Sequence, residues 1–339
     1  MVNKLNILQI GVGYWGPNIL KNLIKNKLID KIYIYEKSKK RVNQLSKIYK
    51  NLIFIKNFSD IYKINKLNTA IISTPANTHY YLAKKLLNKN FNLLVEKPLA
   101  TTLKQVENLY EIANKKKLTL MSGHLYLFNP YIRYIKKSIT SNKLGKLYYL
   151  FSQRLNFGIV RNDIDVKWNL GPHDVSIISF LVGKRKITNV DQISNSFLQK
   201  RKMISDICMM NINYDNGVNA LIHLSWLDPI KTRKLVIVFS KGMIVFDEMN
   251  KIQPLIIYNK KVSILRAKNN KNLYDKNKLR ELIKYTSSKP TIPKIKKKEP
   301  LFEEIDYFIK CIKSSKKPLT GYEHNINVIK ILSYNEKKN

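Results

Sequence analysis

The chain opens with a short apolar stretch, residues 5–10, that leads directly into Gly11, Gly13 and Gly16. A strand, the pattern Gly-x-Gly-x-x-Gly and a helix, in this order, are typical of a βαβ unit that binds a dinucleotide. Gly11 allows the tight turn, Gly13 lets the backbone approach a pyrophosphate, and Gly16 lets the helix pack closely on the strand. The first N–H groups of that helix are expected to face the diphosphate. The N-terminal region is therefore predicted to form a parallel α/β sheet.

Glu36 follows a second apolar stretch, residues 32–35, and lies 25 residues after Gly11. A carboxylate at this separation can accept hydrogen bonds from both ribose hydroxyls of an adenosine. Tyr14 and Trp15, inside the loop, are assigned to the same site. We expect NAD as the cofactor; NADP is the alternative, because four basic residues lie nearby, namely Lys37, Lys39, Lys40 and Arg41. The competing interpretation is a structural turn beside a solvated glutamate.

The 339 residues provide enough chain for two domains with substantial cores. Apolar residues make up 44% of the chain, as in soluble globular proteins. The apolar runs are far shorter than a membrane span, and the first residues lack the pattern of a signal peptide. Cys208 and Cys311 stand far apart and form no metal or redox motif. We expect a cytoplasmic protein without a membrane segment or a metal site.

The formal net charge of +39 raises the question of nucleic-acid binding. Only nine of the 62 basic residues are arginines, and the lysines are dispersed along a chain that also over-uses Asn and Ile. Such a composition is typical of an AT-rich coding sequence, whereas nucleic-acid readers cluster arginines and aromatic residues on one face. We therefore expect no specific nucleic-acid partner. The positive field would still attract anionic substrates.

Up to residue 123, near-continuous apolar strands alternate with amphipathic helices, which predicts a Rossmann domain: a doubly wound parallel sheet covered on both faces. Ligands of such sheets bind beyond the carboxyl ends of the strands. The polar residues that fall at these ends are Thr74, Pro75, Glu96, Lys97 and His124. The predicted domain comprises residues 1–123.

After residue 124 the pattern changes. Helices are predicted at 130–140 and from Gly171 to Leu181, with a strand at 147–151 between them. Further strands follow without helices, at 187–196, 204–214, 218–226, 234–239 and 243–246, with hairpin turns at 215–217 and 240–242. This predicts an α+β domain, residues 124–339, with an open, mainly antiparallel sheet whose free face joins subunits into a homodimer or homotetramer.

The remaining C-terminal segments are assigned by pattern. Residues 266–298 are rich in Lys and Asn and are interpreted as an extended loop. Two helices, within residues 301–335, are expected to pack back on the first domain.

Several motifs together resemble the Gfo/Idh/MocA oxidoreductases. They are the glycine pattern, Ser73-Thr74-Pro75 with His79, Glu96-Lys97-Pro98, Gly123-His124 and Gly171-Pro172-His173-Asp174. The Gly-Tyr-Trp-Gly-Pro-Asn variant of the loop resembles members placed in nucleotide-sugar and surface-polysaccharide biosynthesis. The resemblance implies an NAD(P)-dependent enzyme that oxidises a CH–OH group of a sugar or nucleotide-sugar.

Oxidation of a secondary alcohol needs a base for the hydroxyl proton and a partner for the developing alkoxide. By the resemblance, Lys97 is the partner of the alkoxide, and Pro98 after it forms a cis peptide bond. His173 is the candidate base, at the start of a helix. The alternatives are an ordinary surface lysine and a structural histidine. His79, beside the cofactor, and His124, beside the substrate, are expected to act as positioning residues.

One position departs from the family pattern. Many relatives carry an Asp four residues before the active histidine, where this chain has Asn169, which cannot carry a charge. Arg154, Asn156 and Arg161 are candidates for binding a carboxylate or diphosphate of the substrate, with a surface salt bridge as the alternative for the arginines. Two other functions therefore stay open: a lyase or hydrolase that uses NAD transiently, and a non-catalytic relative that binds sugar or NAD.

Overall fold

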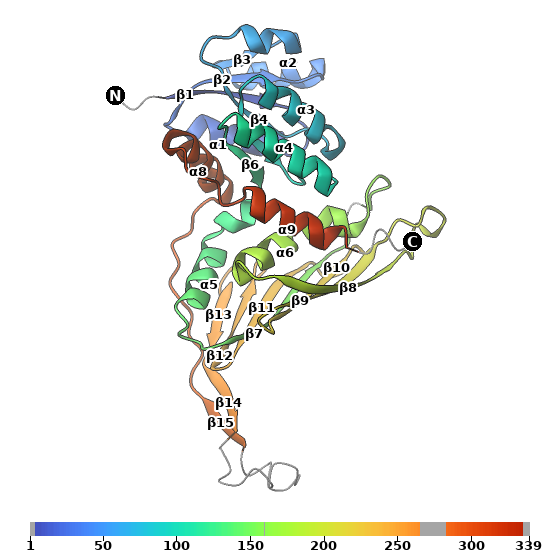
Figure 1. Cartoon of the computed structure of the whole chain (residues 1–339), viewed down its shortest axis with the longest axis vertical. Helices are drawn as coiled ribbons and strands as arrows, with labels where there is room; N and C mark the ends of the chain where they lie inside the picture. The colour runs from blue at the N-terminus through green and yellow to red at the C-terminus, as the bar shows by residue number, and fades with distance from the viewer. Residues whose placement is uncertain (1–3, 159, 265–282, 335–339) are drawn as a thin grey trace. The chain divides into compact units, whose positions relative to one another are not determined.

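The computed structural model describes residues 4–158, 160–264 and 283–334 (Figure 1). These residues form two compact units. The first unit contains the chain up to Asn129 together with the segment that starts at Lys297, and the second contains Pro130–Lys296. Each unit is described by itself below.

The first unit is built on a six-stranded sheet in the order β3-β2-β1-β4-β5-β6, and all its strand pairs are parallel. Its strands are β1 Leu5–Ile10, β2 Ile29–Tyr35, β3 Leu52–Phe54, β4 Thr69–Ile72, β5 Asn92–Glu96 and β6 Leu120–Gly123. The strand order reverses direction between β1 and β4, the place where such sheets bind their ligands. The predicted doubly wound parallel sheet is confirmed.

The helices of this unit connect its strands or follow its last strand in the chain. They are α1 Gly16–Lys25, α2 Lys39–Ile48, η1 Phe58–Lys63, α3 Ala76–Asn88, α4 Leu103–Lys115, η2 Leu125–Phe128, α8 Pro300–Ser314 and α9 Tyr322–Leu332. The side chains of Ser38 and Thr102 cap α2 and α4. Helix α3 begins at Ala76, directly after Pro75, without a side-chain cap. Within this unit α8 packs against α1 and η2, and α9 packs against α4.

The second unit is built on a seven-stranded sheet in the order β13-β12-β11-β7-β10-β9-β8. Its strands are β7 Leu147–Leu155, β8 Ile187–Asn195, β9 Ile207–Tyr214, β10 Asn219–Ser225, β11 Thr232–Phe239, β12 Gly242–Asp247 and β13 Leu255–Tyr258. Only the β7–β10 pair among these is parallel. The predicted open, mainly antiparallel sheet and both hairpin turns are confirmed.

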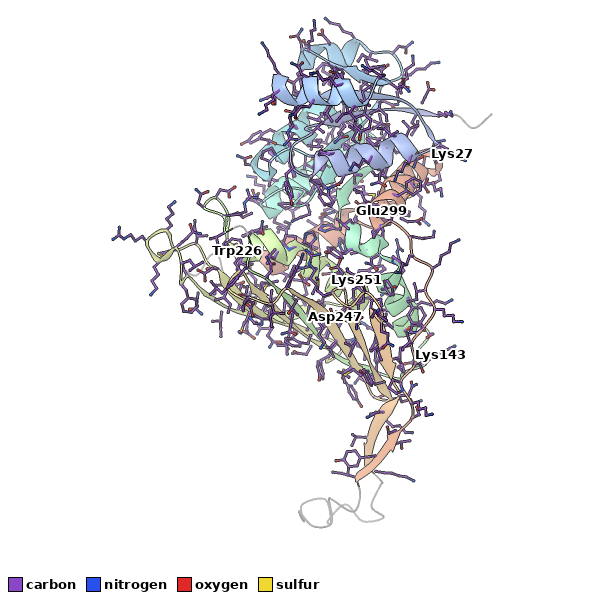
Figure 2. The ribbon with its side chains drawn as sticks, turned by 180° about the vertical axis from the view of Figure 1, so that it is seen from behind. Lys27, Lys143, Trp226, Asp247, Lys251 and Glu299 are labelled. Carbon is purple, nitrogen blue, oxygen red and sulfur yellow. The ribbon has the colours of Figure 1, made fainter. Side chains whose placement is uncertain are left out.

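Two helices, α5 Pro130–Thr140 and α6 Val166–Val182, lie over one face of this sheet (Figure 1), and α6 contacts β7, β9 and β10. Successive side chains of a strand point to opposite faces of the sheet. Figure 2 draws the described side chains on the ribbon. Buried positions such as Leu150, Ile222 and Ile237 alternate with exposed apolar residues on the other face. These exposed residues include Tyr149, Ile193, Met209 and Leu221.

Two boundaries in this unit differ from the sequence prediction. The helix expected to open at Gly171 begins at Val166, because Asp165 caps it by accepting a hydrogen bond from the Trp168 N–H at 2.8 Å. Pro172 therefore lies inside the helix, although a proline is more common in a first turn. Strand β7 extends to Leu155, beyond the predicted end at residue 151.

The expected loop at 266–298 also needs correction, because β15 Ile283–Ser287 pairs with β14 Lys260–Ile264 in an antiparallel hairpin. Residues 265–282 lie outside the described residues. No helix in the described parts of the chain combines the length and apolar character needed to span a bilayer. Across the same residues, no three His, Cys, Asp or Glu side chains are grouped where they could share a metal ion.

Candidate active site

The glycine loop between β1 and α1 has the geometry of a phosphate cradle. Gly11 has a φ of +86°, and a Cβ there would lie 2.8 Å from Thr74 Cγ2. A Cβ on Gly16 would lie 2.8 Å from the carbonyl oxygen of Gly11. A Cβ on Gly13, by contrast, would meet no protein atom within 4 Å. The fold itself thus requires the first and third glycines, while the second borders open space, which fits a bound pyrophosphate.

Two polar side chains outside this loop donate hydrogen bonds to its carbonyl oxygens. Gln9, fully buried in β1, donates from Nε2 to the carbonyl oxygen of Gly16 at 2.8 Å and to that of Gly11 at 3.3 Å. Ser73, after β4, donates from Oγ to the carbonyl oxygen of Gly11 at 2.7 Å. Sequence reasoning missed Gln9; the available signal was an amide side chain two residues before Gly11, between apolar residues of the strand.

Glu36 lies at the carboxyl end of β2, beside the loop. Its Oε2 accepts the Val12 N–H at 2.7 Å, and its Oε1 accepts the Ser38 N–H at 2.8 Å. Each carboxylate oxygen retains acceptor capacity for a hydroxyl group, so the arrangement fits the predicted contact with a ribose. Tyr14 is 92% exposed at the tip of the loop, and Trp15 is half-buried at the start of α1.

The segment after β4 is fixed by buried His79. Its Nδ1 lies 2.8 Å from the carbonyl oxygen of Pro98, and its Nε2 lies 2.8 Å from that of Thr74. Burial lowers the pKa of His79, so the ring is neutral near pH 7 and donates to one carbonyl at a time. Pro75, which precedes α3, is exposed. His79 thus ties the loop after β4 to the loop after β5, which fits a positioning role.

The Glu96-Lys97-Pro98 segment follows at the end of β5, and its Lys97–Pro98 bond is cis. The Lys97 N–H donates to Glu96 Oε2 at 3.2 Å. Burial raises the pKa of Glu96 to about 7, although the Lys97 ammonium and backbone N–H favour its charged form. Glu304 of α8, 1% exposed, was missed by sequence reasoning. Burial and the charge of nearby Glu96 raise the pKa of Glu304 well above its usual value.

A second histidine joins His124 at the carboxyl end of β6. The ring of His324, in the first turn of α9, lies 5.1 Å from the His124 ring in an edge-to-face arrangement. Burial lowers the pKa of His324 to about 4, and it lowers the pKa of His124 well below its usual value. Both rings are therefore neutral near pH 7. No motif in the sequence had marked His324.

In the second unit, His173 lies inside α6 and not at a helix start as expected, because the helix begins at Val166. Asn169 precedes it by four residues, so both side chains lie on one face of α6. Both residues are partly exposed. Their proposed roles stay predictions.

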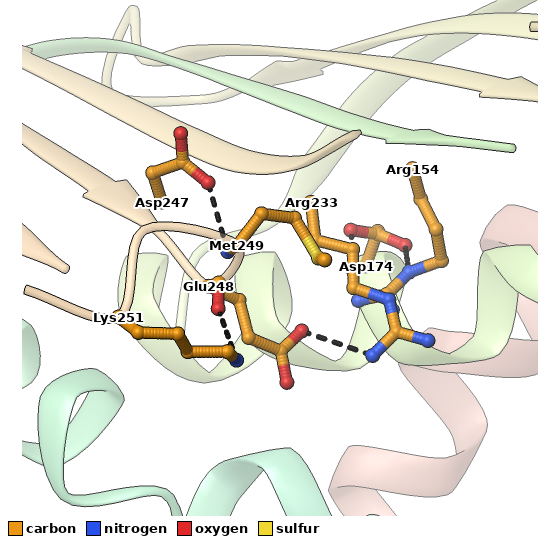
Figure 3. Close-up of polar contacts among 7 residues, drawn as sticks. All are labelled: Arg154, Asp174, Arg233, Asp247, Glu248, Met249 and Lys251. Carbon is orange, nitrogen blue, oxygen red and sulfur yellow. Dashed lines mark hydrogen bonds and ion pairs between the residues drawn. The ribbon is translucent and has the colours of Figure 1, made fainter. Parts of the chain in front are cut away.

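Arg154 lies on β7 and is 5% exposed. Its Nε lies 2.5 Å from Asp174 Oδ2 (Figure 3). The Ser152 hydroxyl donates to Asp174 Oδ1 at 2.7 Å. Asp174, to which no role was assigned from the sequence, is thus the buried counterion of Arg154. This buried pair is different from the surface salt bridge considered for the predicted arginines.

The other two predicted substrate-binding residues lie after β7. The Asn156 backbone N–H donates to the carbonyl oxygen of Ser225 at 3.2 Å. Arg161 is exposed and binds Asp163 with two contacts, from Nε at 2.9 Å and from Nη2 at 2.7 Å. For Arg161 the structure therefore contains the surface salt bridge that was the alternative.

Family models match most of the chain. Residues 5–124 match the model of an oxidoreductase family with an NAD-binding Rossmann fold. Residues 132–245 match the Gfo/Idh/MocA C-terminal domain. Both predicted elements, the NAD-binding domain and the open-sheet domain, are thus assigned to one family.

Curated relatives and solved structures are consistent with this family assignment. An uncharacterised oxidoreductase, YhhX of Escherichia coli, is 26% identical over 58% of each chain. The UDP-N-acetylglucosamine 3-dehydrogenase of Acidithiobacillus ferrooxidans is 28% identical over 36% of this chain and 38% of its own, so neither alignment reaches two thirds of the relative. The solved structure of that dehydrogenase covers 97% of this chain and 95% of its own, with a TM-score of 0.78 at 18% identity. The chain is therefore a member of the Gfo/Idh/MocA family of NAD(P)-binding oxidoreductases.

Proposed function

We propose that this protein oxidises a secondary hydroxyl group of a sugar or nucleotide-sugar, with NAD as the hydride acceptor, in cytoplasmic surface-polysaccharide biosynthesis. The observation that carries the proposal is Lys97, which follows β5 at the sheet edge where the glycine loop also lies. The dehydrogenase of Acidithiobacillus ferrooxidans, which acts on a nucleotide-sugar by its name, supports the substrate class.

Bound NAD supplies the acceptor for the hydride. Lys97 stabilises the negative charge that develops on the substrate oxygen, and His173 takes the hydroxyl proton. Glu96 has a pKa of about 7, so it can be neutral or charged near neutral pH. Its charged form places a negative charge beside the Lys97 ammonium group. His79 and Gln9 hold the loops that surround the cofactor.

The test is NADH formation by the purified full-length chain with a panel of free sugars and nucleotide-sugars. We expect turnover with at least one sugar. Lys97→Ala should lower kcat by about 10²–10³-fold and leave NAD affinity nearly unchanged. Lys104→Ala, which removes an exposed lysine of α4, is the matched control and should behave as wild type. If wild type binds a sugar nucleotide but never reduces NAD with it, the dehydrogenase proposal fails.

Asn169 favours a second candidate, the non-catalytic relative, because an uncharged amide lies one helical turn from His173. Binding of sugar without any chemical change would support it. A lyase or hydrolase with transient redox would instead convert the sugar without net NADH. Product analysis in the same assay therefore separates the three functions.

We further propose that the open face of the second unit's sheet joins subunits. Apolar residues form an in-register row across neighbouring strands of this face, comprising Ile256, Val245, Val236, Phe151 and Leu221. Such a row on an uncovered sheet face is typical of an interface. Light scattering should detect a dimer or tetramer, and Leu221→Lys should shift it toward the monomer. A wild-type monomer at all concentrations would contradict this.

A further inference from the structure

Two arginines lie directly opposite each other on neighbouring strands of the second unit. Arg233 of β11 pairs in register with Arg154 of β7. Both side chains belong to the face covered by α6, because Ser152 and Leu235, the next pair on this face, are buried. Like charges at such positions repel each other, so each arginine requires an anion.

The two arginines are neutralised in different ways. The side chains of Arg154 and Asp174 are 6% and 2% exposed. The side chains of Arg233 and Glu248 are 33% and 26% exposed, with Nη1 at 3.2 Å from Oε2. Breaking a buried pair leaves an unsolvated charge, whereas a partly exposed pair exchanges its partner readily. Arg154 therefore keeps Asp174 as its counterion, whereas Arg233 is able to exchange Glu248 for another anion.

A second cation lies at the same glutamate. Exposed Lys251, in the turn after β12, donates from Nζ to the carbonyl oxygen of Glu248 at 2.9 Å (Figure 3). The nearby carboxylate of Asp247 accepts the Met249 N–H and belongs to the opposite face of the sheet, where Lys234 is its neighbour across the strands. Arg233 and Lys251 thus offer two positive charges around one exchangeable carboxylate.

We propose that Arg233 binds the diphosphate of a nucleoside-diphosphate sugar, which replaces Glu248 as its counterion while Lys251 contacts the same group. This inference rests on the proposed function and narrows its substrate class. The guanidinium fork matches two phosphate oxygens, and two adjacent cations suit a group with more than one negative charge. Arg154, the cross-strand neighbour of Arg233, is bound through Asp174 to α6, the helix that carries the candidate base His173.

The test is calorimetric titration of the full-length protein with UDP, in the presence of saturating NAD so that the glycine loop is occupied. Arg233→Gln should weaken UDP binding by about 10- to 100-fold, and Arg233→Lys should recover only part of it. Glu248→Gln should tighten UDP binding by about 2- to 5-fold, because it removes the competing carboxylate. The matched control is Arg185→Gln, which removes an exposed arginine after α6.

NAD affinity and the unfolding temperature of each variant verify its folding. Equal UDP affinity in wild type, Arg233→Gln and Arg185→Gln overturns the proposal. Dependence on Arg233 for binding of glucuronate but not of UDP also overturns it, in favour of a carboxylate. UDP binding that depends on Arg233, without NADH formation from any sugar, supports this site while the proposed dehydrogenase activity fails.

Discussion

The polar side chains around the glycine loop of the first unit and those on the helix-covered face of the second unit's sheet have different partners. Around the glycine loop the partners are backbone groups: Glu36 accepts N–H groups, and His79 faces two carbonyl oxygens. On the covered sheet face the partners are other charged side chains, as in the pairs Arg154–Asp174 and Arg233–Glu248. Backbone partners are fixed by the fold itself, whereas each charged side-chain partner can be removed by one substitution. Single substitutions should therefore disturb the charged pairs of the sheet face more than the contacts around the loop.

The largest effect is expected from Asp174→Asn. The substitution leaves Arg154 buried with an uncharged neighbour, which should lower the free energy of unfolding by about 3–5 kcal/mol. Asp163→Asn is the matched control, because it makes the same change in the exposed pair with Arg161 and should cost less than about 1 kcal/mol. Urea unfolding measures both. Equal losses would show that burial does not distinguish the two pairs.

His173→Ala is expected to have the next largest effect. Loss of the candidate base should lower kcat about a hundred-fold or more and flatten the acid limb of the rate profile, where the imidazole becomes protonated. NAD affinity should not change, because the glycine loop lies in the other unit. An unchanged pH profile with reduced kcat would indicate that His173 has only a structural role.

The contrast between the units also explains what the sequence could predict. Glu36, Glu96 and His124 were found because parallel strands bring their carboxyl ends to one edge, so position along the chain already specifies position in space. Arg233 and Arg154 become neighbours only through pairing of β11 with β7, strands that are distant in sequence. That register depends on the tertiary packing of the whole sheet.

Helix ends and the C-terminal segment were missed for related reasons. Pro172 suggested a first turn, but the cap supplied by Asp165 starts α6 earlier. His324 reaches His124 only because α9, from the far end of the chain, packs within the first unit. Neither contact leaves a periodic signal in the sequence.

Stability should depend on pH through the first unit's buried carboxyls. The pKa of Glu304 is raised in the folded state, so the unfolded chain releases this proton first as the pH rises above about 4.5. Its contribution to stability is therefore present at low pH and lost as the pH rises through the raised pKa. Glu304→Gln should flatten this decline in a series of thermal unfolding curves, by about 2–4 °C for each kcal/mol involved.

The control for this series is Glu299→Gln, which changes an exposed glutamate (labelled in Figure 2) and should leave the decline intact. The buried histidines act in the opposite direction. His324, with a pKa of about 4, removes stability as the pH falls from about 6.5 toward 4. A decline above about pH 4.5 that is as steep in Glu304→Gln as in wild type would contradict the assignment.

Glu36→Ala should change cofactor preference by a smaller amount. The carboxylate would repel a 2′-phosphate, so wild type should bind NAD more tightly than NADP, and the substitution should reduce this ratio by up to about 10-fold. Titration with both cofactors measures it. The loop itself should survive, because Gln9 and Ser73 still hold it. Tighter binding of NADP by wild type would remove the role assigned to Glu36.

Asn169→Asp should have the smallest effect and tests the second unit most directly. A carboxylate one turn before His173 would stabilise the imidazolium and raise the histidine pKa, which shifts the acid limb of the rate profile to higher pH. If the protein works with Lys97 and His173 alone, kcat at the optimum should stay within about three-fold of wild type, because neither proposed chemical role involves residue 169. Asn169→Ala is the control for loss of the side chain without added charge. A gain in kcat above about ten-fold with Asp, absent with Ala, would mean that the natural protein is impaired at proton transfer, and would favour the binding function over the enzymatic one.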